Sequence, residues 1–231
     1  TGGVGAVTIT NAASATLVDF TGVTVTSING GTMTFASATS VNLGTAPVTS
    51  LTANAATSIE TRMVTAAGVT ISATSATAIN VNQMTSSTGD ISITGAGTPT
   101  IVHFDALATI AGTLTTVTVG EAHFGALTQS TGALAVAAGA AANFAALTDL
   151  DAASSIGGAT VILTNLAGAT GTLTLPNATV GNLPAFSTAS TGKLVLTAAT
   201  SANMVSAAIA DITAAKATSL TLTAQNEDFT L

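Results

Sequence analysis

The chain has 231 residues, of which 47% are hydrophobic and only 6% are charged, and its formal net charge is −7. An ordinary globular domain carries roughly 25% charged residues. This composition excludes a disordered chain, which is poor in apolar residues and rich in charge. Only 3 residues are Lys or Arg, too few to neutralise a phosphate backbone, so nucleic acid is excluded as a partner.

The absence of Cys and the lengths of the apolar runs exclude two further classes. Without Cys, the chain has no disulfides and no thiolate metal sites. The longest nearly apolar run, residues 134–147, is shorter than the roughly 20 residues that a membrane helix needs. We therefore expect a protein that does not span a membrane.

Short segments in which apolar and hydroxyl residues alternate predict β-strands along the chain. From the N-terminus, they include residues 7–10, 23–26, 69–72, 173–175 and 220–223. A period of two is expected of a half-buried strand. Thr suits such a strand because its branched Cβ favours extended backbone while its hydroxyl tolerates water.

An eleven-residue block recurs about every twenty residues and groups these strands into a repeat. Its copies are residues 33–43, 51–61, 71–81, 114–124, 134–144, 173–183 and 194–204. The tenth position is usually Asn or another polar residue, and an apolar residue usually follows it. With weaker copies included, this polar column, which we call the Asn ladder, contains Asn42, Asn80, His103, His123, Asn143, Asn165, Asn182 and Asn203.

A coil of about twenty residues cannot bury its apolar side alone, whereas stacked coils share a continuous core. The repeat therefore predicts an all-β fold, a β-solenoid (β-helix) of about ten coils of roughly 20 residues. Asn bonds nearby backbone groups at turns, and stacked coils would place the ladder residues above one another. No linker interrupts the repeat, so we expect residues 1–231 to form a single domain. Since no Met or signal peptide opens the chain at Thr1, we expect a segment of a longer or polymerising chain.

Two segments depart from the repeat. Between residues 145 and 173 the register loosens, and we expect Asp149 and Asp151 on a longer loop there. Near the C-terminus, helical spacing makes one short helix an alternative to strands. The residues with this spacing are Met204, Ala208, Ile209 and Ile212.

A repeat rich in Thr, Ala, Ser, Gly and Asn and poor in charge and Cys resembles the β-solenoid regions of large secreted bacterial surface proteins. These include adhesins, autotransporter passenger domains, and sheath or surface-layer components. The resemblance covers nearly the whole chain and is one of composition and repeat style. It implies an extracellular or cell-surface location and a structural role.

Two groups of polar residues are candidate sites. His103, Asp105, Glu121 and His123 carry imidazole and carboxylate groups one coil apart, a set that could bind zinc or nickel. The alternative, which we favour, is that both histidines replace Asn in the ladder, so no metal and no cofactor is expected. Asp149 and Asp151 are the only close carboxylates for a glycosidase, and we interpret them as a solvated acidic loop.

We therefore expect a structural, non-catalytic extracellular protein that forms part of a fibre, sheath, surface layer or long adhesin stalk. Its partners would be identical subunits or further solenoid repeats, because open strand edges at the ends of a stack pair readily. The alternative is a polysaccharide- or ice-binding module, the latter through rows of Thr. A polysaccharide-degrading enzyme is the third hypothesis, and it ranks below both.

Overall fold

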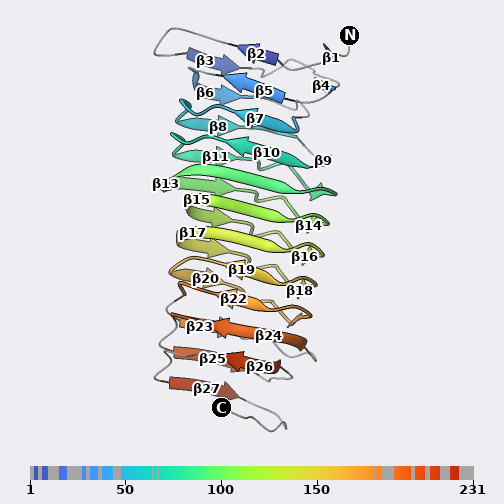
Figure 1. Cartoon of the computed structure of the whole chain (residues 1–231), viewed down its shortest axis with the longest axis vertical. Helices are drawn as coiled ribbons and strands as arrows, with labels where there is room; N and C mark the ends of the chain where they lie inside the picture. The colour runs from blue at the N-terminus through green and yellow to red at the C-terminus, as the bar shows by residue number, and fades with distance from the viewer. Residues whose placement is uncertain are drawn as a thin grey trace.

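The computed structural model of the chain is an elongated stack of parallel β-coils (Figure 1). It describes residues 3–4, 7–9, 16–19, 28–29, 32–35, 38–43, 48–63, 65–66, 68–178, 180–183, 190–198, 201–205, 209–213 and 219–223. All described strand pairs are parallel, and each strand pairs with its counterpart in the next coil. The predicted all-β fold and β-solenoid architecture are confirmed.

The coils in the middle of the described stack contribute to three walls, of which the first is the longest described ladder. Its members pair one after another from the N-terminal to the C-terminal end of the stack. They are β2 (Val7–Ile9), β5 (Thr32–Phe35), β7 (Ser50–Thr52), β10 (Val69–Ser72), β13 (Ile91–His103), β15 (Leu114–His123), β17 (Leu134–Asn143), β19 (Ser154–Ile156), β22 (Leu173–Leu175), β24 (Ser190–Leu196) and β26 (Ile209–Thr213).

The second wall follows the first in each coil. The long strands β13, β15 and β17 pass from the first wall into the second through register shifts. The other members are β3 (Thr16–Asp19), β6 (Ala38–Asn42), β8 (Ser58–Glu60), β11 (Ala78–Asn80) and β20 (Thr160–Ile162), continued by β23 (Val180–Leu183), β25 (Ser201–Val205) and β27 (Ser219–Thr223).

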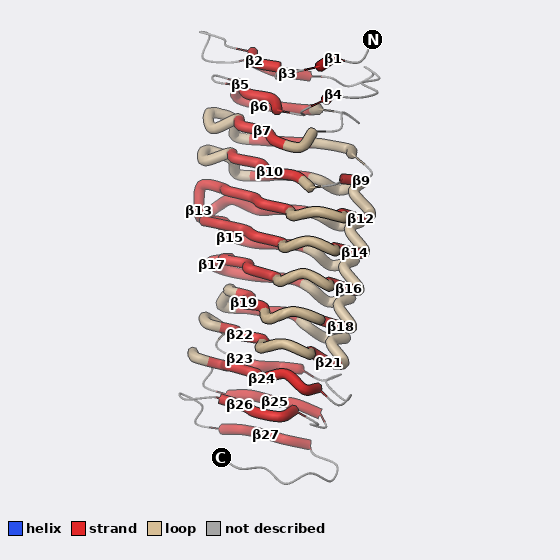
Figure 2. The backbone as a smooth tube through the Cα atoms, turned by 45° about the vertical axis from the view of Figure 1, so that its right-hand side comes forward, coloured by secondary structure: helices blue, strands red, loops and turns tan. Residues whose placement is uncertain are grey.

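The third wall is made of two-residue strands that are stacked one above another along one edge of the molecule (Figure 2). They are β9 (Thr65–Ala66), β12 (Ser86–Ser87), β14 (Thr109–Ile110), β16 (Gln129–Ser130), β18 (Asp149–Leu150) and β21 (Gly168–Ala169). A separate pair joins β1 (Gly3–Val4) to β4 (Ile28–Asn29). A single coil thus turns through three directions before it returns to the first wall.

Two details of the sequence-based prediction need correction. The structure describes about seven turns of the solenoid, slightly fewer than the ten or so expected, because only strands are described in the levels nearest its ends. The alternative of a C-terminal helix is wrong: Met204 lies in β25, and Ile209 and Ile212 lie in β26. β25 pairs with β23 and β27, and β26 pairs with β24, and this strand pairing outweighs the helical spacing. Ala208 lies outside the described residues.

Backbone hydrogen bonding gives the stack a direction. Inward-facing residues donate their N–H toward the next coil: the Phe104 N–H donates to the His123 carbonyl at 2.9 Å. Outward-facing residues donate toward the preceding coil, as the Ala111 N–H does to the Ser87 carbonyl at 2.9 Å. The same forward pattern holds for Leu43, Val81 and Phe124. Because all strands run parallel, each level presents different backbone groups to its two neighbours.

The interior is filled by columns of apolar side chains from all three walls. In the second wall, Phe104, Phe124 and Phe144 are fully buried and stack with ring centroids 5.1 and 5.2 Å apart. Leu107, Leu127 and Leu147 are buried three residues further on, after a β-turn in each coil. Buried aromatic rings contribute large apolar area and a further 0.5–1.5 kcal/mol or so for each well-placed pair. Identical neighbours in adjacent coils therefore make the core continuous.

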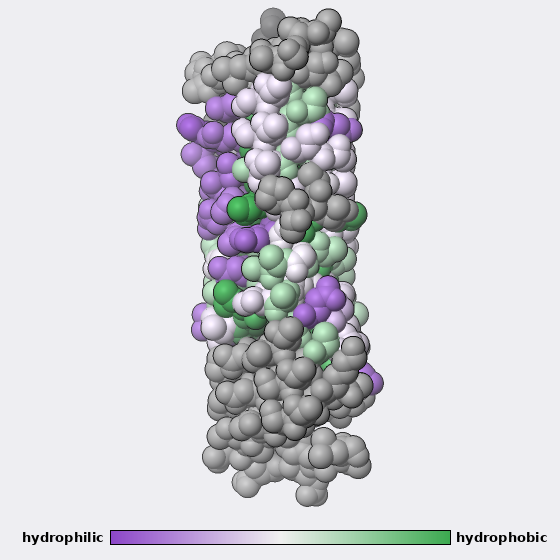
Figure 3. All heavy atoms as spheres, turned by 90° about the vertical axis from the view of Figure 1, so that its left-hand side faces the viewer, coloured by the Kyte–Doolittle hydropathy of each residue, from purple (hydrophilic) through white to green (hydrophobic). Residues whose placement is uncertain are grey.

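On the face shown in Figure 3, hydrophilic and hydrophobic side chains are intermixed. Among the described residues, the large hydrophobic side chains that are exposed are Val117 and Ile162. No helix in the described part of the chain is long and apolar enough to cross a membrane.

Glycine is required where the third wall meets the first, because successive coils nearly touch there. A Cβ on Gly132 would overlap the Gly112 carbonyl, and one on Gly112 would overlap the backbone of Gly89. Backbone atoms cannot move aside as the end of a flexible side chain can. This corner therefore fixes how closely the coils stack.

We predict that Gly132→Ala lowers the free energy of unfolding by about 3 kcal/mol, the upper end of the usual cost of overpacking. Urea denaturation followed by circular dichroism measures the change. Gly125→Ala is the matched control, because its Cβ would meet only the Asn143 Nδ2 at 3.8 Å. The control should stay within about 0.5 kcal/mol of the wild type. Equal effects from both substitutions would contradict the proposed tight corner.

A second prediction concerns Thr61, which is 1% exposed among the apolar residues of the second wall. Its Oγ1 has no hydrogen-bond partner, and burial of an unpaired hydroxyl costs roughly 1–3 kcal/mol. Thr61→Val keeps the shape and removes the hydroxyl, so we expect unfolding to cost about 1 kcal/mol more in the same assay. A loss of stability would instead indicate that the hydroxyl binds a buried water molecule.

Candidate functional site

The outward side of the second wall carries the polar column that the repeat predicts. Strand register pairs Asn42 with Glu60, Glu60 with Asn80, Asn80 with His103, His103 with His123, and His123 with Asn143. These six positions therefore lie one above another. Further along, Asn182 pairs with Asn203 in the same way.

Asn165 does not belong to the Asn ladder. Asn143 pairs with Ile162, whose side chain is 36% exposed at the ladder position. Only 19 residues separate Asn143 from Ile162 because this coil is one residue shorter than its neighbours. Asn165 lies beyond the strand, and its Nδ2 donates a hydrogen bond to the Ala145 carbonyl at 2.8 Å. The sequence-based prediction therefore placed the ladder position of this coil three residues too far along the chain.

Asn143 shows what a ladder residue does locally. Its Oδ1 accepts a hydrogen bond from the Ala145 N–H at 3.0 Å. This contact stabilises the turn that follows the second wall, in the way Asn side chains commonly do. At this level, the side-chain amide therefore bonds to its own coil.

The two histidines stack in the middle of the column. Their rings lie 4.8 Å apart between centroids and 16° from parallel. Each ring meets a carboxylate of its own coil: Glu121 Oε2 lies 2.9 Å from His123 Nε2, and Asp105 Oδ2 lies 3.6 Å from His103 Nδ1. All four side chains are between 29% and 57% exposed.

This geometry brings the four predicted metal candidates into one cluster, yet it separates their ligand atoms. Glu121 precedes its histidine by two residues, whereas Asp105 follows its own in the turn. Within the described part of the chain, no three His, Asp or Glu side chains are arranged to hold a metal ion. Exposed ion pairs of this kind contribute at most about 1 kcal/mol each.

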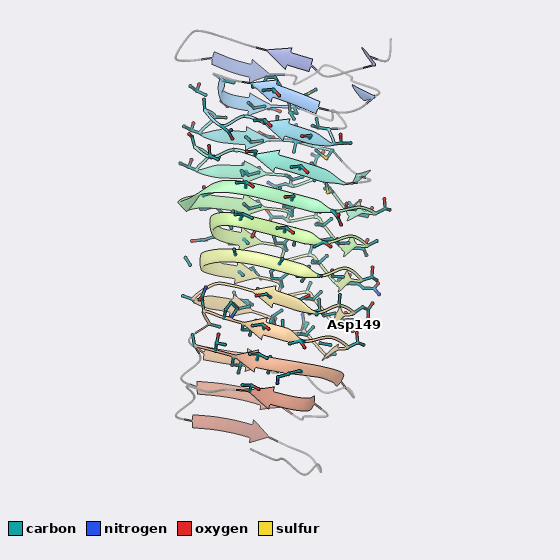
Figure 4. The ribbon with its side chains drawn as sticks, in the orientation of Figure 1. Asp149 is labelled. Atoms are coloured by element: carbon teal, nitrogen blue, oxygen red, sulfur yellow. The ribbon has the colours of Figure 1, made fainter. Side chains whose placement is uncertain are left out.

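Asp149 lies on the third wall (Figure 4), and Asp151 follows directly after its strand. The prediction of a longer loop is wrong for Asp149, which belongs to strand β18 and pairs with Gln129 and Gly168. Both carboxylates are exposed and flank the buried Leu150. They therefore share the outer face of the wall. Asp149 Oδ1 accepts a hydrogen bond from the Leu150 N–H at 3.0 Å.

The first wall carries a regular set of outward hydroxyl groups, which we call the hydroxyl array. One column contains Ser50, Thr70, Ser92 and Thr115, and the next contains Thr34, Thr52, Ser72 and Thr94. These columns are not complete rows of Thr, because Ser occupies some of their positions. Counting Ser as equivalent to Thr would have revealed the array, because residues 50–52, 70–72 and 92–94 all have hydroxyl groups at both outward positions.

Comparison with known proteins identifies no relative: no family model, curated protein or solved structure matches this chain. The candidate sites are therefore interpreted from their own geometry.

If the histidines only replace Asn in the column, Asn should replace them in return. We predict that the double variant His103→Asn, His123→Asn unfolds within about 0.5 kcal/mol of the wild type, since surface substitutions rarely exceed that value. Thermal unfolding with and without added zinc measures both stability and any metal dependence. A zinc-dependent rise in melting temperature that disappears in the double variant would show that the cluster binds metal.

Proposed function

We propose that this chain is a structural, non-catalytic extracellular protein whose β-solenoid forms part of a fibre, sheath, surface layer or adhesin stalk. The directional backbone bonding supports this role most strongly. Inward residues bond forward and outward residues bond backward along the stack. One end of such a ladder is complementary to the other, so a further coil extends it without any change of pattern.

The strands at the two ends of the described stack support the same proposal. In the first wall, β2 pairs with β5 and β26 pairs with β24, each on one side within the described strands. In the second wall, β27 pairs with β25. An open parallel edge is a template for another strand. The natural partner is an additional coil, supplied by the same polypeptide or by an identical subunit.

The surface chemistry agrees with a non-catalytic role. His103 and His123 pair with carboxylates of their own coils, Asp90 accepts a hydrogen bond from the Thr113 N–H, and Asp149 bonds to its own strand. A catalytic centre would need acid, base or ligand groups that converge on one point. The extracellular location rests on the resemblance of the repeat to those of secreted bacterial surface proteins.

We predict that the purified chain associates end to end into rods longer than one subunit, because the backbone bonding of one end of the stack complements that of the other. Electron microscopy would reveal the rods, and sedimentation at several concentrations would reveal a coefficient that rises with concentration. A discrete particle with the mass of one chain at every concentration would contradict the proposal.

A fusion at the C-terminus provides the control for this experiment. A compact folded protein attached directly after Leu231 should obstruct that end and shorten the rods. The same protein attached through a Gly-Ser linker of about 40 residues, with ends roughly 35 Å apart, should permit association. Rods of equal length from both fusions would indicate lateral rather than end-to-end contact.

A further inference from the structure

The hydroxyl array repeats regularly in two directions on the first wall. Strand register places Thr70 between Ser50 and Ser92, and Ser72 between Thr52 and Thr94. Neighbouring strands lie roughly 4.8 Å apart, and outward residues along one strand lie roughly 6.6 Å apart. The array is therefore a two-dimensional lattice of hydroxyl groups whose spacing is set by the backbone.

Thr70 is exposed and the other array residues are half-buried, so their hydroxyl groups are partly accessible to solvent. Elsewhere, Thr side chains bond neighbouring coils: the Oγ1 of Thr128 donates to the Ala108 carbonyl and that of Thr148 to the Thr128 carbonyl, both at 3.0 Å. Within the array, the Ser72 hydroxyl donates to Asn54 Oδ1 at 2.9 Å. The other array hydroxyls make no hydrogen bond to a described protein group, which leaves them able to bond water.

Within the described residues, the second and third walls lack such an arrangement. The ladder positions of the second wall include Glu60, His103 and Ile162, and the corresponding column of the third wall includes Gln129 and Asp149. The array, by contrast, has no charged or amide side chain at any of its positions. In the described part of the stack, a neutral hydroxyl lattice is thus found on the first wall.

We propose that the hydroxyl array binds the surface of ice. Ice presents oxygen atoms that repeat at comparable spacings in two dimensions. The branched side chain of Thr is stiff at χ1, so its hydroxyl and methyl groups are held in place before binding. Water ordered by such a lattice bridges to a solid of the same order at little entropic cost. Charged side chains would hold their own hydration shells and prevent this match.

The same lattice is less suited to a polysaccharide. Sugar rings commonly pack on exposed aromatic side chains, which combine an apolar face with low conformational entropy. The described Phe residues are instead buried, at 1% exposure or less. They are Phe35, Phe104, Phe124 and Phe144. Among the described residues, the wall that carries the array therefore offers hydroxyl and methyl groups without an aromatic platform.

Inhibition of ice recrystallisation by the full 231-residue chain tests the proposal. We expect the wild type to keep ice grains small and Thr70→Lys to require an about tenfold higher concentration, equivalent to roughly 1.4 kcal/mol of binding. Thr70 is exposed, so Lys adds a hydrated charge over the array with little effect on folding. Thr52→Lys, on the adjacent strand and column, should show the same loss.

Thr109→Lys is the matched control, because Thr109 is an exposed outward residue of the third wall. It should retain wild-type activity, and circular dichroism should verify that all three variants are folded. An inactive wild type, or an equal loss in Thr109→Lys, would overturn the proposal. Binding to crystalline cellulose or chitin, sensitive to Thr70→Lys and without any effect on ice, would overturn it in favour of a polysaccharide ligand.

Discussion

The parallel backbone ladder between successive coils is the constraint on which the other features of this molecule depend. It fixes the distance between levels, and it directs the bonds of inward residues forward and of outward residues backward. Residues at equivalent positions are therefore forced into columns, whatever their chemistry. Inside, the columns form a continuous apolar core in which Phe104, Phe124 and Phe144 stack. Outside, they place like side chains at regular intervals.

The sequence contains enough information to predict these columns but not the path between them. Each coil must bury apolar residues at the same positions, so the repeat is visible in the sequence. The stacking of His103 on His123, which occupy the same position of adjacent coils, could be predicted from it. The corners between walls are harder to predict, because different coils form them in different ways. A β-turn at residues 73–76 follows β10, whereas β15 turns the same corner with irregular strand pairing. As a result, the first residues of the eleven-residue blocks do not all lie in one column. Ile71 pairs with Ile93, whereas Leu114 pairs with Ile91, so the block that begins at Leu114 is displaced by one inward-facing residue.

The same uncertainty about the path of the chain at the corners limited the prediction of the candidate sites. Asn165 has the residue type of the Asn ladder, but a coil shortened by one residue gives that place to Ile162. The hydroxyl array could not be recognised from Thr alone, because Ser occupies some of its positions. We propose that the walls have different roles. Side chains in the polar column of the second wall bond to groups of their own coils, while the first wall presents hydroxyl groups to solvent. Along the described stack, the two hydroxyl columns end where Val117 follows Thr94 and Ala135 follows Thr115.

Cysteine cross-linking on the third wall tests the stacking most directly, since the natural chain has no Cys. Thr109 and Gln129 are exposed register partners on adjacent coils, whereas Thr109 and Asp149 lie two coils apart. Disulfides need Cα atoms within about 7 Å, and two coils span roughly 9.6 Å. The account predicts that oxidation links Thr109→Cys to Gln129→Cys and leaves Thr109→Cys and Asp149→Cys unlinked. Efficient linkage of the second pair, or failure of the first, would contradict the stacked-coil register.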